Sequence, residues 1–144
     1  MLKVIIDTNI VVSALIQKSY PHYIVYECVF NGRVQLCLSE PLLNEYIDVL
    51  ARPKFAKIPY FNSNADIVLK QFSNIAVFFE PKISLNLIKD NDDNKLLELA
   101  DESNADFLIT GNSMDFNMSN YKYTQIVSPH NFWDMFSVQI IINP

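Results

Sequence analysis

Short apolar segments along this chain follow two alternating patterns, one typical of buried strands and one typical of helices with a buried face. Continuous apolar runs predict strands at 2–6, 34–38, 75–79, 106–110 and 125–128. Apolar residues at helical spacing predict helices at 9–17, 21–30, 40–50, 65–72, 92–103 and 129–135, with a loop at 54–64. Strands that alternate with helices build a parallel sheet covered on both faces. We therefore expect a three-layer α/β/α fold with a central, mostly parallel sheet, which is a Rossmann-like arrangement.

Residues with special backbone chemistry mark several helix boundaries. Ser39 is a preferred N-cap residue, and Pro41 suits the first turn of the helix that follows it. Arg52-Pro53 is expected to end that helix, because a residue before proline avoids the helical conformation. The chain has only two glycines, which excludes a GxGxxG dinucleotide loop and a GxxxxGK[ST] phosphate loop.

Asp7 directly follows the first predicted strand, in the segment VIIDTN. Removing an ionised carboxylate from water is costly unless something compensates its charge. Asp7 therefore either caps the next helix or holds a cation. In open α/β sheets, ligands bind beyond the carboxyl ends of the strands, where the strand order reverses. Both Asp7 and Gly111-Asn112 follow predicted strands, which is a first indication of a shared site.

Two further acids lie on or beside buried helix faces. Asp93 shares one face with the apolar residues of the predicted helix 92–103, so it either points inward or serves as an N-terminal cap. Glu45 lies at the margin of the apolar arc of the helix 40–50. It is either a functional residue or a surface residue that pairs with Arg52.

Carboxylates that met in one pocket would repel one another strongly. Two of them about 4 Å apart would cost about 4 kcal/mol at an effective dielectric constant of about 20. A divalent cation between Asp7, Glu45 and Asp93 would remove this penalty. An all-oxygen ligand set favours Mg²⁺ or Mn²⁺ over zinc, and the absence of a Cys/His cluster from the sequence agrees.

The composition is that of one ordinary globular domain. With 144 residues, half of them hydrophobic, the chain can bury a substantial core. The net charge of −5 argues against broad nonspecific binding of nucleic acid. This argument weakens if several acids converge on a bound cation, because the cation would offset their charge. Two cysteines outside any CxxC motif are expected to be reduced core thiols. No signal-peptide pattern and no apolar run of roughly 18 residues occurs, so we expect a cytoplasmic protein without a membrane span.

Four segments carry, in this order, a resemblance to a known family: VIIDTNIVVSAL, VQLCLSEPLLNEYIDVLARPKF, DNDDNKLLELADESNADFLITGN and IVSPHNF. The chain resembles PIN-domain proteins, specifically the VapC-like ribonucleases that are toxin components of bacterial toxin–antitoxin pairs. The resemblance implies a PIN-like domain at 1–136, followed by an apolar C-terminal extension at 137–144. This extension is an added edge strand, an interface or a loosely attached tail.

The resemblance implies a metal-dependent ribonuclease that uses Mg²⁺ or Mn²⁺ and hydrolyses RNA phosphodiester bonds. The metal-binding acids of the family match Asp7, Glu45 and Asp93. Polar residues that orient such acids match Thr8 or Asn9 at one position and Thr110 at another. The partners that the resemblance implies, besides RNA, are a cognate antitoxin and a second copy of the chain in a homodimer.

The fourth acidic position departs from the family pattern. Where the family usually has Thr-Gly-Asp, this chain has Asn112, which keeps a catalytic oxygen but lacks the charge, so a second cation should bind more weakly. Asp115 either substitutes through water or is a turn residue. The alternative function is therefore a PIN-fold module that binds RNA or protein with little catalysis. A haloacid-dehalogenase-type phosphatase is disfavoured, because it needs an acid where this chain has Asn9.

Overall fold

The computed structural model describes residues 1–85, 91–111 and 119–142, and across these ranges six strands form one sheet. The strands are β1 (Lys3–Ile6), β2 (Gln35–Leu38), β3 (Val77–Phe78), β4 (Phe107–Ile109), β5 (Asn120–Tyr121) and β6 (Thr124–Val127). Their order is β3-β2-β1-β4-β6-β5, and every neighbouring pair is parallel except β5 with β6. The predicted mostly parallel sheet is confirmed.

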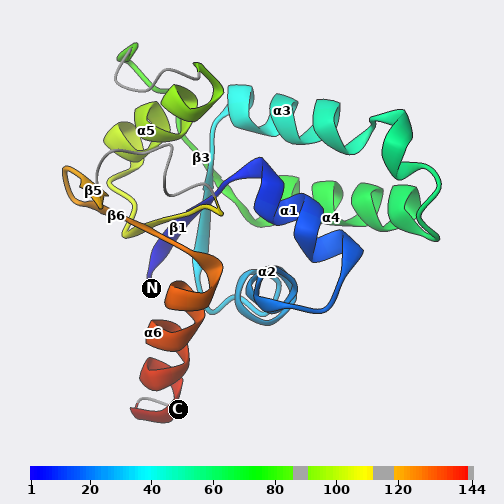
Figure 1. Ribbon diagram of the computed structural model, residues 1–144. Coiled ribbons are helices and arrows are strands. Elements are labelled where there is room, and N and C mark those ends of the chain that lie inside the picture. Colours follow the sequence, from blue (N-terminus) through cyan, green and yellow to red (C-terminus); the bar gives the residue numbers. More distant parts are fainter. Residues whose placement is uncertain (86–90, 112–118, 143–144) are drawn as a thin grey trace.

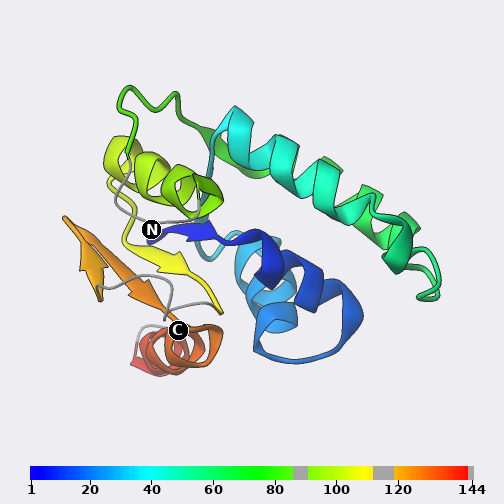
Figure 2. The same ribbon diagram turned by 45° about the horizontal axis from the view of Figure 1, so that its top comes forward.

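Helices cover both faces of this sheet and complete the three-layer α/β/α fold (Figure 1). They are α1 (Thr8–Ile16), α2 (Tyr20–Tyr23), α3 (Glu40–Leu50), α4 (Phe61–Ile75), α5 (Asn91–Ser103) and α6 (Pro129–Ile142), with a π-helical segment η1 (Ile24–Val29) and a 3-10 turn η2 (Pro53–Phe55). α5 packs on one face, while α1, η1 and α6 lie on the other (Figure 2). α3 and α4 run side by side in opposite directions and extend away from the sheet.

The strand order reverses at the centre of the sheet, between β1 and β4. From β1 the chain adds β2 and β3 on one side and then crosses over to place β4 and β6 on the other. The backbone N–H of Asp7 donates to the carbonyl of Ile109 at 3.0 Å, which joins the two strand ends. In a doubly wound sheet, this switch point is where ligands bind. Asp7, after β1, and Thr110, after β4, therefore stand where a ligand is expected.

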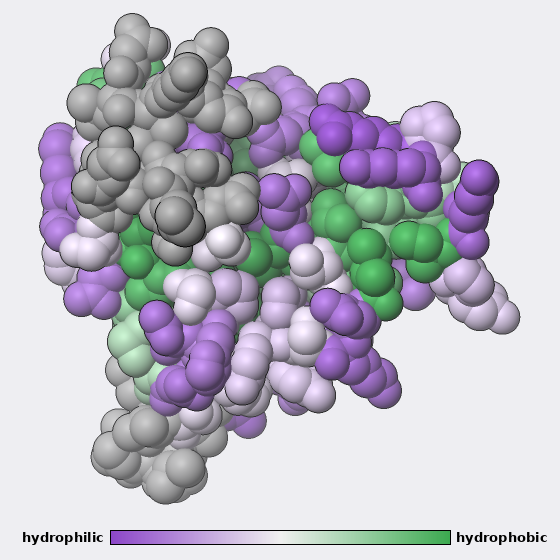
Figure 3. Space-filling view, in the orientation of Figure 1, coloured by the Kyte–Doolittle hydropathy of each residue, from purple (hydrophilic) through white to green (hydrophobic). Residues whose placement is uncertain are grey.

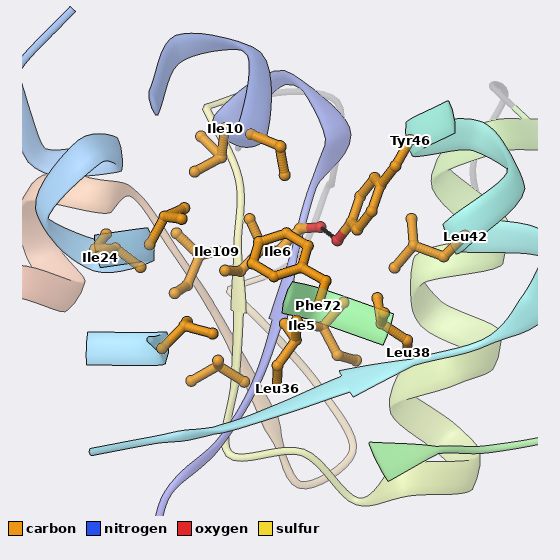
Figure 4. Close-up of a cluster of buried hydrophobic side chains, with 14 of the residues drawn as sticks. Ile5, Ile6, Ile10, Ile24, Leu36, Leu38, Leu42, Tyr46, Phe72 and Ile109 are labelled. Atoms are coloured by element: carbon orange, nitrogen blue, oxygen red, sulfur yellow. Dashed lines mark hydrogen bonds between the residues drawn. The ribbon is translucent and has the colours of Figure 1, made fainter. Parts of the chain in front are cut away.

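A buried tyrosine holds α3 against the end of β1. Tyr46 is 0% exposed, and its hydroxyl donates to the backbone carbonyl of Ile6 within the core shown in Figure 4. The ring of Phe72 from α4 lies beside it, with 6.0 Å between the ring centroids. Because Ile6 precedes Asp7 and Tyr46 follows Glu45, this contact brings two acids from different elements to the same end of the sheet.

Most predicted elements are confirmed within a residue or two. α3 begins after Ser39, whose Oγ accepts a hydrogen bond from the backbone N–H of Leu42 at 3.2 Å, as expected of an N-cap. α4 begins inside the segment expected to be a loop, because Phe61 is buried and stacks on Phe55 with 4.7 Å between the ring centroids. The short strand β5 was not predicted.

The C-terminal part differs most from expectation. α6 continues to Ile142, so residues 137–142 extend a helix, and the suggestion that they form an edge strand is wrong. The division expected at residue 136 falls inside α6 and stays a prediction. Cys28 and Cys37 are buried and free, as expected of core thiols. Within the described ranges, no helix is long and apolar enough to cross a membrane.

Candidate active site

A cleft of about 670 Å³ opens at the carboxyl end of β1, between the start of α1, α3 and the start of α5. Its lining is predominantly polar, and it contains the three acids that the sequence singled out. The lining residues are Asp7, Thr8, Asn9, Pro41, Asn44, Glu45, Asp48, Val49, Arg52, Asp93 and Lys95. The cleft therefore brings together side chains from β1, α1, α3 and α5.

Asp7 occupies the N-cap place of α1, yet its side chain makes no capping hydrogen bond. The carboxylate is only 5% exposed, and its Oδ2 accepts a hydrogen bond from the Thr110 hydroxyl at 2.7 Å. Burial raises the pKa of Asp7 above its usual value, and the negative charge of Glu45 raises it further. The hydrogen bond from Thr110 and the backbone N–H groups of Thr8 and Asn9 lower it, but the net shift is upward. Asp7 is thus a desolvated carboxylate that is repelled by a second carboxylate. A bound cation would offset both the lost hydration and this repulsion.

Glu45 lies on α3, one residue before the buried Tyr46. Its Oε2 accepts a hydrogen bond from the Thr8 hydroxyl, and its Oε1 lies 3.6 Å from the Nζ of Lys95. This Oε1 is buried and makes no hydrogen bond with any residue that the structure describes. The pairing with Arg52 that was considered from the sequence is not found, since Arg52 makes no ion pair within the described ranges.

Asp93 stands in the first turn of α5 and is 7% exposed. Leu96, Leu97 and Ala100, on the same helical face, are also buried, so the prediction that Asp93 points with the apolar stripe is confirmed. The side chain lines the cleft that holds Asp7 and Glu45. Its position in the first turn also suits an acid for electrostatic reasons, because the helix N-terminus carries partial positive charge.

The expected orienting residues fall into three groups. Thr8 and Thr110 each donate a hydrogen bond from the hydroxyl to one of the acids, Glu45 and Asp7 respectively. Asn9 lines the cleft, and its side chain makes no hydrogen bond to an acid among the described residues, whereas its backbone N–H lowers the pKa of Asp7. The positions proposed for Asn112 and Asp115 lie outside the described residues.

Sequence reasoning passed over several cleft residues. Asp48 lies three positions after Glu45 and four positions after Asn44, so it neighbours each of them on the surface of α3, and all three line the cleft. Lys95 is a further cleft residue, and its ion pair with Glu45 joins α5 to α3. The helical spacing around Glu45 could have indicated Asn44 and Asp48. Nothing local could have indicated a contact between residues 45 and 95.

The oxygen donors of this cleft suit a hard divalent cation, but the acids do not form a closed ligand cluster. Among residues 1–85, 91–111 and 119–142, no three His, Cys, Asp or Glu side chains are close enough together to enclose a metal ion. Two features nevertheless favour a cation here. The Asp7 carboxylate is desolvated and electrostatically strained by Glu45, and Glu45 Oε1 is buried without a hydrogen-bond donor from the described residues.

Asp7, Glu45 and Asp93 thus line one cleft at the topological switch point of an α/β/α fold. Residues 3–114 match the PIN-domain family, so the chain belongs to this family. It is also similar to an uncharacterised protein of Methanocaldococcus jannaschii, with 32% identity over 110 residues that cover 76% of this chain and 70% of the relative. PIN domains are generally nucleases and generally use divalent metal ions. The family expected from the sequence is confirmed.

Proposed function

We propose that this protein is a Mg²⁺- or Mn²⁺-dependent endoribonuclease that hydrolyses RNA phosphodiester bonds in the cleft at the end of β1. One observation carries this proposal: Asp7, Glu45 and Asp93, which are far apart in the chain, line a single cleft in a PIN-domain protein. The two hydroxyls that hydrogen-bond to Asp7 and Glu45 support it, because they hold two of the acids in fixed orientations.

In this proposal Asp7, Glu45 and Asp93 hold the cation, in part through water molecules. Partial hydration agrees with the open arrangement of the acids, because Mg²⁺ usually keeps several waters and is bound by only one or two carboxylates. The bound ion would supply an activated water and stabilise negative charge on the phosphate oxygens. Asn112 is proposed as an additional oxygen donor at the site, with Asp115 as a further orienting residue.

The chain's own residues do the positioning. The Thr110 hydroxyl holds Asp7 Oδ2 at 2.7 Å, so the other carboxylate oxygen of Asp7 faces a defined direction. The Thr8 hydroxyl does the same for Glu45 through Oε2. The ammonium group of Lys95 lies beside Glu45 in the cleft, where it is placed to contact a phosphate of the substrate. Hydrolysis by water needs no protein nucleophile, and none is proposed.

Cleavage of single-stranded RNA tests the proposal. A 5′-labelled RNA is incubated with the protein and Mg²⁺ or Mn²⁺, and we expect EDTA, Asp7→Ala and Asp93→Ala each to abolish the cleavage. Glu102→Gln is the matched control, because Glu102 also lies on α5 but does not line the cleft and forms a 3.9 Å ion pair with Lys82. Cleavage at the wild-type rate in Asp7→Ala or Asp93→Ala would overturn the assignment.

A PIN-fold binding module with little catalysis is the second candidate. The open arrangement of the acids among the described residues, together with Asn112 in place of a family acid, favours it. Calorimetric titration with Mg²⁺ separates the two candidates when wild type is compared with Asn112→Asp. Ion binding accompanied by RNA turnover in the wild type supports the enzyme. If the wild type binds RNA without cleaving it and Asn112→Asp cleaves it, the binding module is supported.

The same proposal makes the protein the toxin of a toxin–antitoxin pair that acts in the cytoplasm, as a homodimer held inactive by a cognate antitoxin. A groove of about 320 Å³ between α3 and α4 offers a protein partner an apolar surface that includes the exposed Ile47. Induced expression of the wild type should arrest growth, whereas expression of Asp93→Ala should not.

Light scattering should give the mass of two chains. If the groove between α3 and α4 is the dimer contact, Ile47→Asp should reduce this mass to that of one chain.

A further inference from the structure

Positive charge gathers in the connection between α3 and α4, residues 52–60, which we call the α3–α4 turn. Arg52, Lys54 and Lys57 lie within six residues, and no acid occurs between Asp48 and Asp66. All three side chains are exposed, and none makes an ion pair with another residue that the structure describes. In a chain with a net charge of −5, this turn is therefore a local cationic surface.

The α3–α4 turn begins inside the proposed active site. Arg52 lines the cleft that contains Asp7, Glu45 and Asp93. From there the chain continues along the end of the molecule where α3 turns into α4 (Figure 1). In Figure 3, hydrophilic residues lie at the edge of this end of the surface, beside a hydrophobic patch. A strand that leaves the cleft past Arg52 would meet the other two cations next.

The turn presents its charges on a fixed backbone. Phe55 is buried and stacks on Phe61 with 4.7 Å between the ring centroids and an interplanar angle of 19°. Successive backbone hydrogen bonds link Phe55 to Arg52 at 3.1 Å, Ile58 to Phe55 at 3.0 Å and Phe61 to Ile58 at 3.1 Å. A surface of this kind loses little conformational entropy when it binds a ligand.

Tyr60 ends the turn with an exposed aromatic ring on an unusual backbone. Its φ of 63° and ψ of 4° lie in the left-handed region that glycine adopts without steric cost, and the residue is 79% exposed. Its carbonyl accepts hydrogen bonds from the N–H of Asn64 at 2.9 Å and from Ser63 Oγ at 3.1 Å, and these require no tyrosine side chain. The ring is thus mostly exposed to solvent, although a left-handed backbone conformation is unfavourable for a tyrosine. An outlier of this kind is a reason to look for a function of the exposed ring.

We propose that the α3–α4 turn is a docking surface for single-stranded RNA that extends from the catalytic cleft. Lys54 and Lys57 contact successive phosphates, and the ring of Tyr60 stacks on an unpaired base. Cations combined with an exposed ring are how proteins hold single strands, because only unpaired bases offer a free face for stacking. The proposal rests on the proposed function for the identity of the ligand as RNA, and it adds which part of the chain selects a single strand.

Fluorescence anisotropy tests the docking surface apart from catalysis. A labelled single-stranded RNA of 30 nucleotides is titrated with protein in EDTA at several salt concentrations. Lys54→Gln/Lys57→Gln removes two phosphate contacts, and each contact contributes about 0.7 to the steepness of log affinity plotted against log salt concentration. The plot for the double variant should therefore be shallower by about 1.4. Lys82→Gln/Lys122→Gln is the matched control, because it makes the same charge change at two exposed lysines outside the turn. The control should leave the slope unchanged.

Tyr60→Gly tests the stacking, because glycine suits the backbone and keeps the fold. We expect RNA affinity to fall about fivefold or more, the lower end of the effect of one stacked base, with no loss for heparin, an anionic polymer without bases. Equal losses for RNA and heparin would overturn the stacking. Unchanged salt slopes in Lys54→Gln/Lys57→Gln would overturn the docking surface. If RNA binding depends on the α3–α4 turn but no RNA is cleaved, the docking surface stands and the nuclease proposal is refuted. If RNA is cleaved but binding does not depend on the turn, the nuclease proposal stands and the docking surface is refuted.

Discussion

The hydrogen bond from Tyr46 to Ile6 offers a quantitative test of how α3 is held beside β1. In Tyr46→Phe the ring remains and only the hydroxyl is lost, so packing against Phe72 is kept. The hydroxyl is 0% exposed with its residue, and water cannot easily replace it as the donor to the Ile6 carbonyl. Leaving a buried polar group without its partner costs about 1–3 kcal/mol. For a chain of this size, such a loss lowers the melting temperature by about 3–9 °C, at about 3 °C per kcal/mol.

The pH dependence of this effect follows from the pKa of Tyr46. Burial, reinforced by the charges of Asp7 and Glu45, raises the Tyr46 pKa well above its usual value of 10.0. A group whose pKa is raised by folding contributes stability below its unfolded pKa, and the contribution is lost as the pH rises through the folded value. The stability difference between wild type and Tyr46→Phe should therefore be largest below pH 10 and should shrink above it.

Urea unfolding at pH 7 and at pH values above 10 measures both effects. Tyr60→Phe is the control, because the Tyr60 hydroxyl is exposed and its removal should change the free energy of unfolding by less than about 0.5 kcal/mol. A change below about 0.5 kcal/mol in Tyr46→Phe at pH 7 would contradict the reasoning. So would a difference that grows as the pH is raised.

Three other predictions concern orientation, capping and thiol chemistry. Thr110→Val should reduce RNA cleavage about 10- to 100-fold in a chain that still folds, because Asp7 loses the hydroxyl that orients it; unchanged rates would remove this role. Ser39→Ala should lower the free energy of unfolding by about 1 kcal/mol, measured by urea unfolding, because α3 loses its cap. Burial raises the pKa of Cys28 to about 12 and that of Cys37 to about 11, so little of either thiol is present as the reactive thiolate at pH 8. Iodoacetamide at pH 8 should therefore label the native chain at least about a hundredfold more slowly than the unfolded chain. Rapid labelling of the native chain, counted by mass spectrometry, would refute this.

Local rules were enough to predict the elements that carry the site. Asp93 could be predicted to point inward because it shares a helical face with three apolar residues, and Ser39 could be predicted as a cap from its residue type and position. Asp7 could be predicted to stand at a binding edge because it follows a strand in an alternating α/β pattern. Each of these inferences depends on a handful of neighbouring residues.

Contacts between distant segments could not be predicted in the same way. The start of α4 depends on Phe61 stacking on Phe55, which is a tertiary contact that turns an expected loop into helix. The surroundings of Glu45 depend on Thr8 and Lys95, each many residues away along the chain. Helical periodicity placed Glu45 at the margin of a buried face, but only the fold shows which residues meet it there.

The central claim is that Asp7, Glu45 and Asp93 share one divalent cation. Crystals soaked in Mn²⁺ and measured for anomalous scattering test this directly, because the anomalous signal locates Mn²⁺ without any assumption about which residues bind it. We expect one strong anomalous peak in the cleft among these three carboxylates, and loss of that peak in Asp93→Asn. A cleft without a peak at saturating Mn²⁺, or a peak of undiminished strength in Asp93→Asn, would contradict it.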